Sequence, residues 1–82
     1  MRIRQATGED AASLAELSHQ LGYPTSIDQA KNRLPVIFDS KDHRVLVACL
    51  DDGLIVGWIH VFLTLRVESD PFAELGGFVV AE

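Results

Sequence analysis

The sequence contains a single cysteine, Cys49, among its 82 residues, so no disulfide can form within the chain. Small extracellular domains of this length usually compensate for a small core with several disulfides. A chain without them fits a reducing compartment, and we predict a cytoplasmic location. Its hydrophobic core must therefore stabilise the fold unaided, close to the smallest size at which a single domain does so.

Positive charge is also scarce. Seven Lys and Arg stand against twelve Asp and Glu, which gives a formal net charge of −5. Proteins that bind a nucleic acid duplex need a basic face, because neutralising phosphates supplies most of their affinity. The few basic residues here are scattered along the chain. We therefore expect no nucleic acid partner.

Long apolar runs are missing as well. The longest, residues 54–65, is interrupted by Gly57, His60 and Thr64 and falls short of the roughly 20 residues that span a bilayer. The N-terminus becomes polar at once and lacks the apolar segment of a signal peptide. With 48% hydrophobic residues, the composition is nevertheless that of a globular domain. We expect no membrane partner.

The chain opens with a strand pattern and then a helix pattern. Residues 2–6 alternate between polar and apolar, as in a short half-buried strand. A capping-box-like Thr-Gly-Glu-Asp follows from Thr7, and three leucines then recur on one helical face. These signals predict a helix over residues 8–21 that Gly22 ends.

A second helix is predicted over residues 27–38. Ser26 and Gln29 have the spacing of another capping box, at which a helix begins. Pro35 lies inside the apolar pattern, where it removes one backbone donor and crowds the preceding turn. The sequence therefore predicts a kink or an early end at this proline.

The second half of the chain has the pattern of strands. β-Branched and apolar residues fill 44–50, and Asp-Asp-Gly at 51–53 is a strong hairpin signal. A long apolar strand is predicted over 54–67, a turn over 68–71 and a last strand over 73–81. The predicted order is β-α-α-β-β-β in one domain over residues 1–82, an α+β fold with a mostly antiparallel sheet and two helices.

This order, together with three local strings, resembles the N-terminal half of the GNAT superfamily of N-acetyltransferases. Residues 3–10 are similar to the first strand and helix of that fold, and residues 44–58 to its second and third strands. Phe-Ala-Glu-Leu-Gly-Gly-Phe-Val-Val at 72–80 is similar to the fourth strand, which holds acetyl-CoA. The resemblance covers essentially the whole chain. It implies transfer of an acetyl group from acetyl-CoA to an amine, on a small molecule or a protein.

The chain departs from the family pattern at its end. In the family, the fourth strand leads into a glycine-rich turn that cradles the cofactor pyrophosphate at a helix N-terminus. This sequence stops at Glu82, before any such turn. We therefore interpret it as the N-terminal portion of an acetyltransferase that is inactive by itself and binds acetyl-CoA weakly or not at all.

The resemblance also implies which residues take part in the chemistry. The backbone of Phe78, Val79 and Val80 is expected to contact acetyl-CoA, although these residues could equally be plain core positions. Glu74 corresponds to a glutamate that serves as the general base in histone-type members. Strand alternation would place it on the face of Gly76, Phe78 and Val80, partly desolvated and suited to accept a proton. The alternative is a solvent-facing glutamate near the turn.

Histidine, tyrosine and cysteine side chains are further site candidates. In the family, the loop after the first helix lines the acceptor pocket, so His19 and Tyr23 are candidate acceptor contacts, or else a solvated histidine and a tyrosine at the core edge. His60 is expected to be a buried core histidine beside Trp58. Neither the histidines nor Cys49 has the spacing of a metal site, so no metal is expected.

An alternative to the enzyme is a protein-interaction module with the same half-fold that catalyses nothing. Either way, the last strand would be an apolar sheet edge, and one sheet face would lack its covering helices. Because water cannot compensate for exposed apolar surface, we expect a homodimer that buries the last strand or the uncovered face.

Overall fold

The computed structural model describes residues 1–81, which form one layer of sheet and one layer of helices. The chain order is strand, short 3-10 turn, two helices and three strands, which confirms the predicted α+β order. In sequence these elements are β1 (Arg2–Gln5), η1 (Gly8–Asp10), α1 (Ala11–Gln20), α2 (Ile27–Asp39), β2 (His43–Cys49), β3 (Ile55–Arg66) and β4 (Ser69–Val80).

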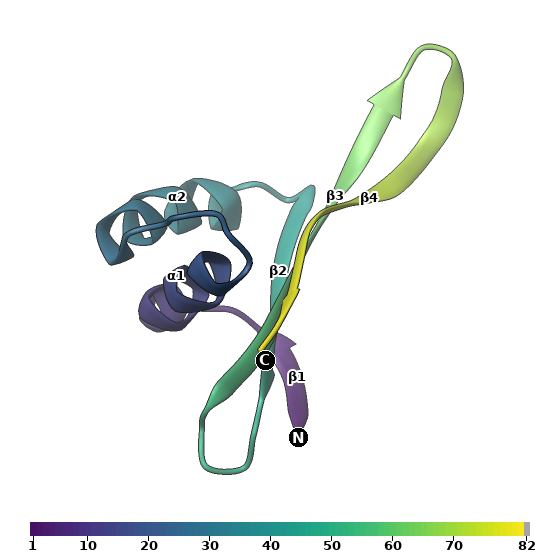
Figure 1. Ribbon diagram of the computed structural model, residues 1–82. Coiled ribbons are helices and arrows are strands. Elements are labelled where there is room, and N and C mark those ends of the chain that lie inside the picture. The colour runs from purple at the N-terminus through teal and green to yellow at the C-terminus, as the bar shows by residue number, and fades with distance from the viewer. Residues whose placement is uncertain (82) are drawn as a thin grey trace.

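The sheet has the strand order β1-β2-β3-β4, and every neighbouring pair is antiparallel. Within the described residues β1 and β4 are therefore the edges of the sheet. Both helices lie against the same face (Figure 1). No described element covers the opposite face, which we call the bare face.

The core lies between the helices and the face of the sheet that they cover. Alternate residues of β2, such as Val45 and Val47, are buried against Leu14 and Leu17 of α1. This alternation is the period-two pattern that predicted the strand, and the leucines are those that predicted the helix. The residues of β3 and β4 that lie opposite the buried residues of β2 therefore share this covered face.

An ion pair between half-buried Arg4 and buried Asp10 fixes the connection from β1 to α1. The Asp10 carboxylate accepts hydrogen bonds from both terminal nitrogens of Arg4, at 2.8 and 2.9 Å, and from the backbone N–H of Thr7 at 2.8 Å. The Arg4 guanidinium holds the pKa of this carboxyl below its ordinary value, against the opposing effect of burial. The predicted helix start at Thr7 is thus stabilised by Asp10, although its first turn is 3-10 rather than α.

Helix α2 begins as predicted but continues past its proline. Ser26 and Gln29 exchange side-chain to backbone hydrogen bonds at 2.9 and 3.0 Å, which completes the capping box. Of the kink or early end predicted at Pro35, the early end is wrong, since the helix runs on to Asp39. Pro35 is exposed, so the carbonyl that loses its helical donor can bind water instead.

The β3–β4 hairpin turns earlier than the sequence suggested. The turn consists of Val67 and Glu68, and β4 already begins at Ser69, so the predicted turn over 68–71 and strand start at 73 are corrected. Pro71 is tolerated because β4 is an edge strand, where a missing backbone donor need not interrupt a ladder on both sides. The hairpin extends well beyond the helices (Figure 1).

No helix among residues 1–81 is long and apolar enough to cross a membrane.

Candidate functional site

A β-bulge interrupts β4 near its centre. Gly77 pairs with His60 and Leu75 with Val61, so Gly76 has no partner of its own on β3. An extra residue of this kind shifts the alternation of side chains by one position. Residues before the bulge therefore face the opposite side from the one that strict alternation predicts.

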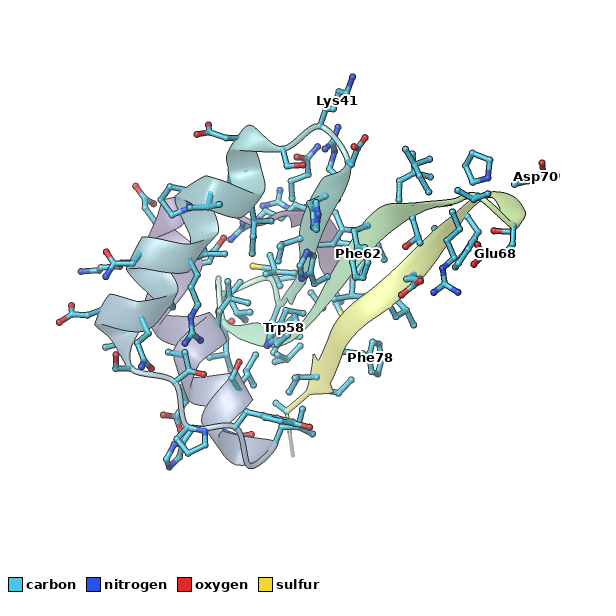
Figure 2. The ribbon with its side chains drawn as sticks, turned by 90° about the horizontal axis from the view of Figure 1, so that it is seen from above. Lys41, Trp58, Phe62, Glu68, Asp70 and Phe78 are labelled. Atoms are coloured by element: carbon cyan, nitrogen blue, oxygen red, sulfur yellow. The ribbon has the colours of Figure 1, made fainter. Side chains whose placement is uncertain are left out.

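The two glycines at the bulge leave room for aromatic rings. A Cβ atom on Gly77 would lie 2.5 Å from Cη2 of Trp58, and one on Gly76 would lie 2.8 Å from Cε1 of Phe62. Contacts this short do not occur between real atoms, so larger residues here would displace β4 or the rings. Trp58 lies between the sheet and the helices, whereas Phe78 projects from β4 on the other side (Figure 2).

Glu74 changes face because of this bulge. It pairs with Phe62 and so lies on the covered face, opposite to Phe78 and Val80, and the predicted shared face is wrong. Its carboxylate accepts a hydrogen bond from Arg66 at 3.2 Å, and the Arg66 guanidinium also lies 5.2 Å from the centre of the Phe72 ring. Glu74 is thus partly exposed and ion-paired rather than desolvated in an apolar strand.

The three residues predicted to contact acetyl-CoA do not present their backbone in the same direction. Ala81 donates its backbone N–H to the Val56 carbonyl at 2.7 Å, and antiparallel pairing then directs the backbone groups of Val79 toward β3 as well. The N–H and C=O groups of Phe78 and Val80 point the other way, to the open edge of the sheet. Val79 is buried, at 3% exposure, whereas the other two side chains are about 60% exposed.

Two histidines meet on the covered face. Nδ1 of His43 on β2 lies 2.9 Å from Nε2 of His60 on β3, which is a hydrogen bond between the two rings. The ring of Phe62 stacks on His43, with 5.1 Å between centroids and 15° between planes. Burial lowers the pKa of His60, and the neighbouring charge of protonated His43 lowers it further.

A cavity of about 130 Å³ opens beside this pair, between the helices and the sheet. His60 and Trp58 line its sheet side, and Ser18, Thr25 and Arg33 are its polar residues from the helical layer. The indole Nε1 of Trp58 is buried and has no hydrogen-bond partner within residues 1–81. The cavity is large enough for a few water molecules.

The two predicted acceptor contacts lie at the margin of this region. His19 is exposed near the end of α1, and Tyr23 is 69% exposed in the loop that follows. Neither lines the cavity beside His60, whereas Ser18 and Thr25, which flank them in sequence, do. Cys49 is buried, and no group of three or more potential metal ligands occurs in the described part of the chain.

Sequence reasoning treated His60 as a core residue and did not single out His43. The two are 17 positions apart, and only the register of the β2–β3 hairpin brings them together. That register includes a shift between Ala48 and Cys49. The sequence predicts a hairpin at the Asp-Asp-Gly turn. Aligning its two strands residue by residue from that turn is the signal that could have brought His43 close to His60.

Comparisons with known proteins identify the fold. No protein-family model matches the chain, and no curated protein matches its sequence. Among solved structures, a GNAT family acetyltransferase of Staphylococcus aureus superposes with a TM-score of 0.81 at 24% identity, over 96% of this chain and 61% of that one. An aminoglycoside 6′-N-acetyltransferase of Acinetobacter haemolyticus gives 0.80 at 19% identity, over 99% and 57%.

A further match is described as a transcriptional regulator of Bacillus halodurans, with a TM-score of 0.78 at 21% identity, over 98% of this chain and 59% of that one. The chain thus spans about 60% of the length of each of these structures. TM-scores near 0.8 over nearly all of this chain mean that these structures share the arrangement described above. The described residues therefore have the fold of the N-terminal half of a GNAT acetyltransferase.

Proposed function

We propose that this chain forms the part of an N-acetyltransferase that holds the acetyl group of acetyl-CoA and one side of the amine site. The observation that carries the proposal is the open edge of β4 immediately after its glycine bulge. There, the backbone groups of Phe78 and Val80 point away from β3. Two such N–H groups in a fixed position can bind a thioester carbonyl and stabilise the negative charge that develops on it.

The amine would approach from the covered face. Two side chains on this face can take up its proton, namely Glu74 and His60, and the functional proposal holds with either. His19 and Tyr23 would contact the acceptor from the loop after α1. The acceptor is an amine on a small molecule or on a protein, and the assay below distinguishes between the two.

The test is an acetyl-transfer assay on the full-length protein as its gene encodes it. Acetyl-CoA is supplied with a panel of amines that includes polyamines, aminoglycosides, amino acids and lysine peptides. The expected result is amine-dependent release of coenzyme A thiol together with an acetylated amine in the mass spectrum. Thiol release that no amine accelerates would reject the proposal.

We propose further that residues 1–82 on their own are inactive and bind acetyl-CoA weakly. They include no glycine-rich turn for the pyrophosphate, which would otherwise supply several charge-assisted hydrogen bonds. Calorimetry on the 82-residue chain is expected to detect no acetyl-CoA binding at micromolar concentrations. A micromolar dissociation constant would contradict this, because it would show that the four strands and two helices suffice to bind acetyl-CoA.

The bare face favours a second, non-catalytic candidate, a protein-interaction module. Its residues are almost all apolar, and a depression lined by Ile3, Ile59 and Phe78 lies on it. Together with the exposed edge of β4, the bare face forms a contiguous apolar patch and not a scatter of single exposed apolar residues. We propose that a second copy of the 82-residue chain covers it. Acetyl transfer by the full-length protein would favour the enzyme, and its absence together with stable dimerisation would favour the module.

The proposed setting is the cytoplasm. Acetyl-CoA-dependent transfer needs a compartment that supplies this thioester, and the single cysteine is buried as a free thiol. The net charge of −5 supports the expectation that neither nucleic acid nor an anionic membrane surface is a partner.

A further inference from the structure

Resting on the proposed acetyl transfer, we propose that His60 is the base that takes the proton from the attacking amine, and that His43 is the residue that positions it. The pair lies half-buried on the covered face, and His60 lines the cavity between the helices and the sheet.

The hydrogen bond between the rings determines which nitrogen of His60 is free. Nε2 of His60 is engaged with Nδ1 of His43 at 2.9 Å, so Nδ1 of His60 is the nitrogen that remains for a substrate. That nitrogen faces the bulge, since a Cβ atom placed on Gly76 would lie 3.3 Å from it. The absence of a side chain on Gly76 therefore keeps access to Nδ1 open.

The same bond can run in either direction in the neutral pair, and His60 is a base when it is the donor. When His60 carries its proton on Nε2, it donates to Nδ1 of His43, and its own Nδ1 has the free lone pair of a base. His43 then carries its proton on Nε2. Stacking of Phe62 against His43 keeps the acceptor ring in place. After His60 gains a second proton, the bond from Nε2 to His43 becomes charge-assisted and stronger.

The environment favours the neutral base before the reaction. Burial and the nearby His43 both lower the pKa of His60, so the ring is unprotonated at neutral pH. The other charged groups near the pair are Arg33 of α2, which lines the same cavity, and Glu74 of β4, which pairs with Phe62. Asp39, Lys41 and Arg44 line the adjoining cavity beside His43, and Arg44 donates to the His43 carbonyl at 2.7 Å. Glu74 is itself ion-paired with Arg66 at 3.2 Å, which lowers its availability as the base.

The step balances with acetyl-CoA and the amine alone. The amine nitrogen attacks the thioester carbon, the C–N bond forms and the C–S bond breaks. One amine proton passes to Nδ1 of His60, and coenzyme A leaves as a thiolate. The proton then passes from His60 to the thiolate or to water, which regenerates the neutral ring and gives the amide and coenzyme A as products.

Steady-state kinetics of the full-length protein test this role. His60→Gln is expected to lower kcat by about 100-fold or more and to remove the acidic limb of the pH profile. His43→Gln is expected to lower kcat less and to leave the KM for acetyl-CoA unchanged, because His60 keeps its lone pair but loses the ring that orients it. Lys31→Gln, exposed on α2 and lining neither cavity, is the matched control and should leave kcat unchanged. Circular dichroism checks that each variant is folded.

Unchanged kcat and pH profile in His60→Gln would overturn the proposal. So would loss of the acidic limb in Glu74→Gln alone. Nitrogen-15 spectra of the imidazoles give a second readout that needs no activity: His60 is expected to be protonated on Nε2 at neutral pH, and protonation on Nδ1 instead would overturn the assignment. If the wild-type protein acetylates no amine, the proposed function and the catalytic role of His60 fail together, whereas the spectra still separate a wrong base from a wrong function.

Discussion

At the scale of single residues, Asp10 shows how one buried carboxylate can organise the start of a helix. It is buried and accepts three hydrogen bonds, two from Arg4 and one from the backbone of Thr7. A carboxylate in this position cannot be replaced without leaving donors unsatisfied. The link from β1 to the helical layer therefore depends on its charge.

We predict that Asp10→Asn lowers the melting temperature by roughly 5 to 10 °C, a shift typical for the loss of one buried polar contact in a domain of this size. The matched control is Glu9→Gln in the same turn, where the side chain is exposed and makes no hydrogen bond or ion pair in the described structure. A variant as stable as the control would contradict the account.

The pH dependence follows from the same carboxyl. Its pKa is lowered in the folded state from an ordinary 3.8, so the unfolded chain binds the proton more readily. The stability from this pair is complete above about pH 4 and is lost as pH falls through the lowered folded value. Acid unfolding of Asp10→Asn should lack this contribution.

Glu74 and His60 show what residue patterns can and cannot predict. The string at residues 72–80, which contains both glycines, correctly predicted β4, because a strand pattern can be recognised from consecutive residues alone. The face of Glu74 could not be obtained by alternation, since one extra residue in the bulge reverses it. The meeting of His43 and His60 depends on hairpin register, which is a property of two strands and not of either alone.

At the scale of elements, the glycine bulge and Trp58 form one packed unit. Gly77→Ala is expected to destabilise the domain by about 1 to 3 kcal/mol, because the new Cβ would overlap the Trp58 ring at 2.5 Å. Trp58 is the only tryptophan, so its fluorescence reports the displacement directly. Urea unfolding measures the stability.

Gly8→Ala is the matched control for this substitution. A Cβ atom there would meet nothing within 4 Å, and the residue lies in the short turn before α1. If Gly77→Ala were as stable as Gly8→Ala, with an unchanged emission spectrum, the tight contact between β4 and Trp58 would be refuted.

Helices and strands were predictable here to the extent that their signals were local. Capping residues and leucine spacing predicted both helix starts, and the Asp-Asp-Gly turn predicted the β2–β3 hairpin, where Gly53 adopts a φ of +92°. The start of β4 differs from the prediction because Pro71 lies within the strand and not in a turn. Edge strands accept proline, and whether a strand lies at an edge depends on the whole sheet.

At the scale of the whole molecule, the bare face and the β4 edge dominate the surface. Leu75, Phe78 and Val80 are each about 60% exposed on or beside this face. For the 82-residue chain at roughly 100 µM, a concentration at which weak dimers form, we predict a homodimer in sedimentation velocity. Burying several such side chains contributes multiple kcal/mol at about 25 cal/mol per Å².

Phe78→Lys tests this interface by placing a charge on the bare face. The variant is expected to sediment as a monomer, whereas Val36→Lys, on an exposed position of α2, should remain a dimer. A monodisperse wild-type monomer at this concentration would contradict the proposed association.

The most direct test of the whole account is an amide chemical-shift map of the full-length protein titrated with acetyl-CoA. The account predicts saturable binding in which the largest shifts within residues 1–81 fall on Phe78 and Val80, whose N–H groups face the open edge, and on the adjacent bulge at Gly76 and Gly77. Saturation with shifts confined to other parts of the fold, or no binding at millimolar acetyl-CoA, would contradict it.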